Sequence, residues 1–145
     1  MVEYLTYDEY TEMGGTLDET LFNSLAFDAQ SYIDWITFNR LWKESWRTEE
    51  IMERVKLCMY HLIGLLNTKA NILTPDVSAS GGINVNAQLL SQANDGVSAT
   101  YAVLSGNSLY EKNKQEIDDS INRYLNGVGD NLGRKILYRG LYPNE

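Results

Sequence analysis

The sequence predicts a mainly helical protein, a small helical bundle with one inserted β-hairpin. Apolar residues recur at steps of three and four along most of the chain, which is the pattern of amphipathic helices. Only two of the 145 residues are proline, so long stretches are free to be helical. By contrast, residues 83–103 contain runs that alternate apolar and polar residues with a period of two, which is typical of strands.

Length and composition fit a single domain, residues 1–145. With 145 residues, of which 43% are hydrophobic, the chain can bury a core without disulfide bonds, and its one cysteine excludes an internal disulfide. The net charge of -8 disfavours binding to nucleic acid phosphates. The acidic N-terminus does not resemble a signal peptide, and the longest apolar run is far too short for a membrane span. We therefore expect a soluble protein with no membrane partner.

A short helix is expected near the N-terminus, followed by a stop and a long helix. Thr6 and Glu9 have the spacing of a capping box. Gly14 and Gly15 then allow backbone angles that residues with a Cβ rarely adopt. The long helix is expected over residues 18–39. Its apolar stripe comprises Leu21, Phe22, Leu25, Ala29, Tyr32, Ile33 and Ile36.

A second long helix is expected after Thr48, a plausible N-cap followed by two glutamates. It should end before Pro75, because the residue preceding proline avoids the helical region. Its apolar stripe covers much of the circumference, which places this helix at the centre of the fold. The C-terminal helix is expected to be capped by Ser108 and to end at residues 126–129.

Between these two helices, residues 75–107 are predicted to be an insertion that carries the β-hairpin. Residues 83–89 and 97–103 alternate apolar and polar residues, and Asn94-Asp95-Gly96 favours a turn between them. Because an isolated hairpin is marginally stable in water, it is expected to lean on the helices or on another subunit. The hairpin residues expected to contact a neighbouring subunit are Val97, Ala99, Tyr101 and Val103.

The C-terminal segment, residues 132–145, is predicted to be a docking tail. It holds three of the twelve basic residues, interleaved with aromatic residues and leucine. Such a tail either packs on its own core or docks on a partner, and an acidic or apolar groove of a protein is favoured over nucleic acid. Removing residues 132–145 is expected to abolish docking and to leave the helical domain folded. The expected docking residues are Arg134, Lys135, Tyr138, Arg139, Leu141 and Tyr142.

Candidate catalytic and metal-binding residues do not assemble into a recognisable site. His61 is the only histidine, and no serine lies in a G-x-S-x-G context. Cys58 and His61 lie three residues apart, but a stable zinc site usually needs four ligands. Asp118 and Asp119 point about 100° apart on a helix, which favours a solvated face. We expect no enzyme activity, cofactor or metal. A group of aromatic residues is interpreted as core packing or an interface anchor: Trp35, Phe38, Trp42 and Trp46.

Three groups of residues, in their order along the chain, point to a known family. They are Tyr4, Thr6, Glu9, Tyr10 and Gly14-Gly15 with Ile33-Asp34, Thr37 and Arg40; Gly96-Val97-Ser98 with Tyr101; and Gly133-Arg134-Lys135 with Leu137, Arg139 and Gly140. In this pattern the chain resembles the small helical head–tail connector proteins, also called adaptors or neck proteins, of long-tailed bacteriophages and prophages of Gram-positive hosts. The match covers most of the chain through loose motifs. Residues 91–95 depart from the more acidic, serine-rich turn of that family.

The resemblance implies a structural protein of the virion, made in the host cytoplasm and placed at the head–tail interface. Such proteins form a ring, commonly of twelve copies, beneath the portal protein of the capsid. Their C-terminal segments dock on the portal, and the opposite face receives a stopper or tail-completion protein. DNA passes through the lumen without sequence-specific binding. The alternative is an acidic helical regulatory module of the antitoxin or DNA-mimic type, which the small size and the acidity favour.

Overall fold

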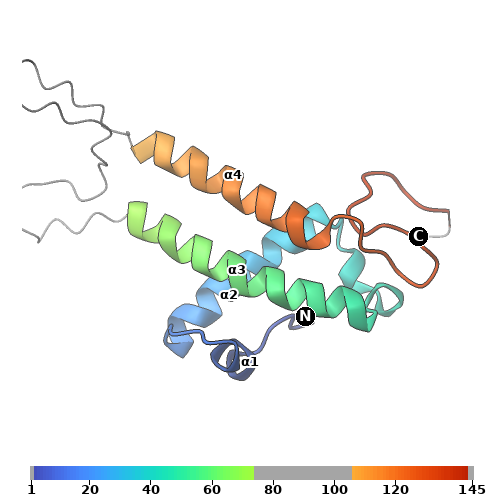
Figure 1. Ribbon diagram of the computed structural model, residues 1–145, viewed down its shortest axis with the longest axis horizontal. Helices are drawn as coiled ribbons and strands as arrows, with labels where there is room; N and C mark the ends of the chain where they lie inside the picture. The colour runs from blue at the N-terminus through green and yellow to red at the C-terminus, as the bar shows by residue number, and fades with distance from the viewer. Residues whose placement is uncertain (1, 74–105, 144–145) are drawn as a thin grey trace, which may run out of the picture.

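The computed structural model describes residues 2–73 and 106–143, and within these ranges the protein is mainly helical, as predicted (Figure 1). The predicted hairpin at 83–103, with its contacts at Val97, Ala99, Tyr101 and Val103, lies outside the described residues. No helix in the described ranges is long and apolar enough to cross a membrane. The elements are α1 (Tyr7–Glu12), α2 (Glu19–Ile36), the 3-10 turns η1 (Arg40–Trp42) and η2 (Glu44–Trp46), α3 (Glu49–Leu73) and α4 (Gly106–Leu125).

The two longest helices, α3 and α4, run antiparallel and side by side (Figure 1). Helix α2 packs on α3, and α1 packs on α2. The segment that follows α4, residues 126–143, lies at the end of the molecule where α3 begins (Figure 1). As predicted, α3 is central, because its buried side chains contribute to one core shared by all the helices. That core includes Tyr4, Tyr10, Phe22, Ile33, Leu41, Trp46, Ile51, Val55, Met59, Leu62, Ile63, Ile117, Ile121 and Ile136.

Local signals account for α1 and its stop. The Glu9 backbone N–H donates to Thr6 Oγ1 at 3.2 Å, and the Thr6 N–H donates to Glu9 Oε2 at 3.0 Å, which confirms the predicted capping box. Glu9 also forms an ion pair with Lys56 of α3. Gly14 adopts a φ of +95°, and a Cβ at Gly15 would lie 2.2 Å from the Tyr10 ring. Gly14 thus permits the turn, and Gly15, which has no Cβ, leaves room for the buried Tyr10 ring.

Helix α2 begins as predicted and ends earlier than predicted. Asp18 caps it by accepting a hydrogen bond from the Leu21 N–H at 3.1 Å. The core side of α2 contains Phe22, whereas Leu21 is 38% exposed, so its assignment to the buried stripe was wrong. Phe22 takes that place because its ring packs on those of Tyr7 and Tyr10 of α1.

Helices α3 and α4 agree with the sequence except at the start of α4. The Ile51 N–H donates to Thr48 Oγ1 at 3.3 Å, which confirms the predicted cap of α3. Helix α4 begins at Gly106, so Ser108 lies inside the helix and the prediction that it caps α4 was wrong. Helix α4 ends at Leu125, and Gly127, two residues later, has a φ of +80°, which confirms the predicted stop at residues 126–129.

Candidate protein-docking surface

The buried side chain of Arg40 links the C-terminal segment to the helical body. Only 2% of Arg40 is exposed. Its guanidinium donates hydrogen bonds to the backbone carbonyls of Ile136 (2.8 Å), Tyr138 (2.5 Å) and Gly140 (2.7 Å). It also lies 5.3 Å from the ring centroids of Trp46 and Tyr142. Arg40 therefore fixes the path of residues 136–140.

This anchoring changes the expectation for a truncated protein. Ile136 is completely buried in the core, and Val128 before it is 5% exposed. Removing residues 132–145 would take away Ile136 and the carbonyls of Ile136, Tyr138 and Gly140 that accept from Arg40. A buried guanidinium that loses three hydrogen bonds is strongly destabilising. The tail is thus part of the fold, and deleting it is not expected to leave the helical domain intact.

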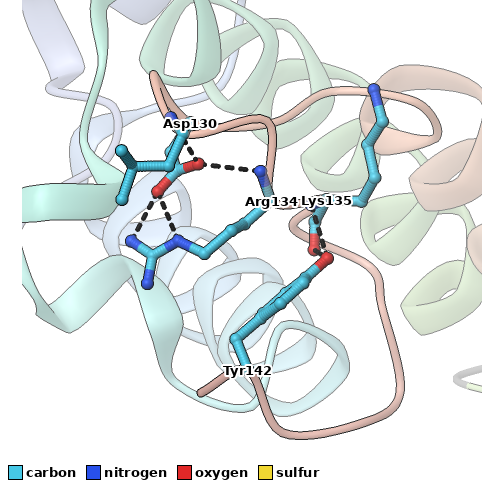
Figure 2. Close-up of polar contacts among 5 residues, drawn as sticks. Asp130, Arg134, Lys135 and Tyr142 are labelled. Atoms are coloured by element: carbon cyan, nitrogen blue, oxygen red, sulfur yellow. Dashed lines mark hydrogen bonds and ion pairs between the residues drawn. The ribbon is translucent and has the colours of Figure 1, made fainter. Parts of the chain in front are cut away.

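A second polar cluster, centred on Asp130 and Arg134, fixes the turn at the start of the tail (Figure 2). Asp130 Oδ1 accepts hydrogen bonds from the backbone N–H groups of Leu132 (3.1 Å) and Arg134 (2.9 Å), and Arg134 Nε donates to Oδ2 at 2.7 Å. Burial raises the pKa of Asp130, but Arg134 and these N–H groups outweigh it, so the net pKa lies below the ordinary value. The Arg134 guanidinium also covers the Trp46 ring, 4.5 Å from its centroid.

The six predicted docking residues therefore divide into two groups. Arg134 is committed to Asp130 and Trp46, and Tyr142 packs on Trp46 while its hydroxyl accepts a hydrogen bond from the Lys135 N–H at 2.6 Å (Figure 2). The side chains of Lys135, Tyr138, Arg139 and Leu141 are exposed, with Leu141 88% exposed. Two of them also have contacts within the chain: the Lys135 ammonium donates to the Gly127 carbonyl, and the Tyr138 ring packs on that of Tyr142. Only this second group is placed to meet a partner.

The end of α2 brings a further aromatic side chain to the surface. The Phe38 N–H donates to the Trp35 carbonyl at 3.3 Å, and the Asn39 N–H donates to the Asp34 carbonyl at 2.8 Å. This is the Schellman pattern, whose left-handed residue is usually glycine. Here that residue is Phe38, with a φ of 54°, followed by Asn39 with a φ of 57°. A left-handed conformation costs a residue with a Cβ about 1–2 kcal/mol, and it leaves the Phe38 ring 55% exposed.

The predicted aromatic group separates into a buried and an exposed part. Trp46 is 1% exposed and belongs to the core, whereas Trp35 and Trp42 are 74% and 59% exposed. The sequence predicted core or interface for all four rings, and it gave no signal that would divide them. The exposed rings surround a groove of about 630 Å³, here called the aromatic groove, lined chiefly by Trp35, Phe38, Trp42, Leu137 and Arg139.

One buried acidic residue, Asp34, is among those that line the aromatic groove. Asp34 is 5% exposed and accepts a hydrogen bond from the hydroxyl of Tyr4, which is fully buried. Burial, and then the Asp34 carboxylate, raise the pKa of Tyr4, so its hydroxyl stays protonated and continues to donate. Among the described residues that line the groove, Arg139 carries the only exposed charge. The groove thus offers apolar rings and one cation.

Charge is unevenly distributed along the chain. Residues 1–39 contain eight of the twenty acidic residues and none of the twelve basic ones. Residues 40–145 therefore hold twelve of each, and the whole net charge of -8 arises from the N-terminal part. The aromatic groove combines rings from this acidic part with Arg139 from the tail.

The residues considered for chemistry lie apart from this surface. Cys58 is fully buried, and burial raises its pKa to about 12. His61 is half-buried against the Tyr124 ring, 5.9 Å away between centroids. Asp118 is half-buried and Asp119 exposed. Within the described ranges, no three His, Cys, Asp or Glu side chains are grouped so that they could hold a metal ion.

The described arrangement suits the docking of another protein. Large aromatic rings and arginines are the side chains that dominate binding energy in protein interfaces. Both are exposed here: the rings at the end of α2 and in η1, and Arg139 on the segment that Arg40 fixes. Comparisons with protein-family models, with curated proteins and with solved structures found no match for this chain.

Proposed function

We propose that the protein is a structural adaptor, the head–tail connector that links a capsid portal to the neck and tail of a long-tailed bacteriophage. The family assignment is supported by the ordered residues at the N-terminus and in the tail, from Tyr4 to Gly140, that resemble those connectors. The observation that carries a docking role is a set of exposed large apolar side chains, which lie between the end of α2 and η1 and in the segment after α4. They are Trp35, Phe38, Trp42, Leu132, Tyr138 and Leu141, each at least 50% exposed.

In this proposal the portal binds the outward side chains of the tail: Lys135, Tyr138 and Leu141. Leu141 and Tyr138 are 88% and 50% exposed and supply apolar contact, and Lys135 supplies a cation. The bonds from Arg40 hold the intervening backbone in place before binding. A surface ordered in advance loses little conformational entropy on docking, which favours affinity. Copies would form a ring, commonly of twelve, around the DNA path and receive the stopper or tail-completion protein on the opposite face.

Co-sedimentation with the portal protein of the same phage or prophage tests this function. Point variants are preferable to truncation, because the tail contributes Ile136 to the core. The double variant Tyr138→Ala/Leu141→Ser should lose portal binding. Leu57→Ser is the matched control, since Leu57 is 43% exposed and belongs to α3 rather than to the tail. Equal co-sedimentation of wild type and the tail variant would refute portal docking through this segment.

The acidic regulatory module is the second candidate, and one observation favours it. The eight acidic residues of the first 39, with no basic residue among them, could present a negative surface to a basic protein. A stable one-to-one complex with a basic toxin or DNA-binding protein would support this candidate. Rings with a central channel, seen by electron microscopy after addition of the portal, would favour the connector.

A further inference from the structure

Two distinct surfaces of the molecule expose large aromatic side chains. The first is the aromatic groove, with Arg139 at its edge. The second surrounds Phe27 of α2, which is 58% exposed beside a shallow hollow lined by Val2, Glu3 and Ala26. Phe27 and Trp35 are eight residues apart on α2, which separates them by about 12 Å along the helix axis and about 80° around it. We call the second surface the Phe27 face.

The two surfaces carry opposite charge. Of the described residues that line the hollow, Glu3 is the only charged one, and it is exposed. The nearby chain is acidic, because residues 1–39 contain no lysine or arginine. The aromatic groove instead has Arg139 as its only exposed charge among the described lining residues. One surface therefore presents a projecting ring beside an anion, and the other a ring-lined groove beside a cation.

These charges decide how two copies of the chain could meet. A symmetric contact of groove with groove would bring two Arg139 cations into one interface with no exposed anion from either lining, and a contact between two Phe27 faces would bring together two Glu3 carboxylates with no cation from either lining. Like charges brought together in an interface are unfavourable. A contact of the Phe27 face with the aromatic groove instead pairs Glu3 with Arg139 and covers exposed rings on both sides. The fitting occupant of the groove is thus the Phe27 face of a second copy.

We propose that copies of this chain associate head to tail, each placing Phe27 in the aromatic groove of the next with Glu3 beside Arg139. A contact between two different surfaces repeats from copy to copy, so it builds a closed ring or a filament. This inference rests on the proposed function, for which it identifies the contact between ring subunits. It assigns the groove to the neighbouring copy and leaves Lys135, Tyr138 and Leu141 to the portal.

Charge reversal followed by sedimentation velocity at increasing protein concentration tests the contact without any portal. The wild type should associate, and less so when ionic strength rises from about 0.1 M to about 1 M, which shortens the Debye length from about 10 Å to about 3 Å. Arg139→Glu and Glu3→Lys should each weaken self-association about tenfold, and the double variant should restore it. A strictly monomeric wild type, or a double variant as weak as the single ones, would overturn the inference.

Cysteine cross-linking tests the direction of the contact. The native Cys58 is fully buried and can remain in place. With Phe27→Cys in one copy and Trp42→Cys in another, mild oxidation should give a covalent dimer, and a chain carrying both changes should give a ladder. Neither single variant should cross-link with itself. Self-linking of Phe27→Cys alone would show a symmetric contact and contradict the head-to-tail arrangement.

The two proposals fail in different ways. If the charge-swapped double variant regains self-association but no variant binds the portal, the connector function fails and the head-to-tail contact stands. If Trp42→Ala abolishes portal binding and leaves self-association unchanged, the groove belongs to the portal. That result would overturn the inference and leave the connector function standing.

Discussion

Replacing Arg40 with methionine should destabilise the protein by about 4 kcal/mol. Methionine keeps an unbranched side chain but removes all three hydrogen bonds to the tail. The lost bond to Ile136 counts for about 2 kcal/mol, because that residue is fully buried. The Tyr138 and Gly140 carbonyls belong to exposed and half-buried residues and can turn to water, so they count for about 0.5 kcal/mol each. Loss of the stacking on Trp46 and Tyr142 adds about 0.5 kcal/mol for each ring.

Urea unfolding followed by tryptophan fluorescence measures this loss, which is a large share of the roughly 5–15 kcal/mol typical of a domain. Arg40→Lys should lose about 2 kcal/mol, which is less than Arg40→Met, because an ammonium can still donate a hydrogen bond but lacks the planar fork that reaches several carbonyls. Arg139→Met, at an exposed position, should stay within about 0.5 kcal/mol of wild type. A loss below about 1 kcal/mol for Arg40→Met would refute the reasoning, because burial of Ile136 alone would then hold the tail.

Three further predictions concern backbone strain, packing and pH. Phe38→Gly should be about 1 kcal/mol more stable than Phe38→Ala in urea unfolding, because only glycine adopts a φ of 54° without strain; equal stability would refute a strained Phe38. Gly15→Ala should lower stability by about 1–3 kcal/mol, since the new Cβ would collide with the Tyr10 ring, and an unchanged thermal midpoint would contradict this. Burial raises the pKa of Cys58 from 9.0 to about 12, so its contribution to stability is complete below pH 9.0 and is lost as pH rises toward 12. Cys58→Ala should therefore reduce the loss of unfolding free energy between pH 9 and 12. Because the pKa of Tyr4 is also raised, part of that loss should remain in the variant. An unchanged pH profile would show that Cys58 does not contribute to the loss.

The starts of α1, α2 and α3 could be predicted from the sequence, because local contacts determine them. Thr6, Asp18 and Thr48 cap their helices through bonds to residues three positions away, and such short spacings can be read directly from the sequence. The end of α2 could not be read in this way. It depends on Phe38 in a left-handed conformation, for which a phenylalanine gives no signal. The start of α4 was misplaced because Ser108, a good capping residue by type, lies inside the helix.

Composition predicted the role of the C-terminal segment only in outline. The basic, aromatic character of residues 132–145 indicated either packing or docking, and the structure shows the packing, through buried Ile136 and the bonds from Arg40. Docking on a partner stays a prediction, and composition did not indicate which side chains take which role. That division follows from long-range contacts, chiefly Arg40 with residues 136–140 and Arg134 with Trp46. Long-range contacts also explain why, among the aromatic residues between positions 35 and 46, Trp46 is buried and the other three are exposed. Trp46 is buried beneath Arg40, Arg134 and Tyr142, a contact that no local spacing encodes.

Because Trp46 is buried and Trp35 and Trp42 are exposed, intrinsic tryptophan fluorescence can report on two different events in this protein. The three are the only tryptophans in the chain. Trp46 is shielded by aromatic and guanidinium groups, so its emission should respond when the tail detaches and stay insensitive to a soluble quencher such as iodide. Trp35 and Trp42 should be quenched readily in the free protein and protected when the groove is filled. A chain with Trp35→Phe and Trp42→Phe would report unfolding alone, and a chain with Trp46→Phe would report occupancy of the groove.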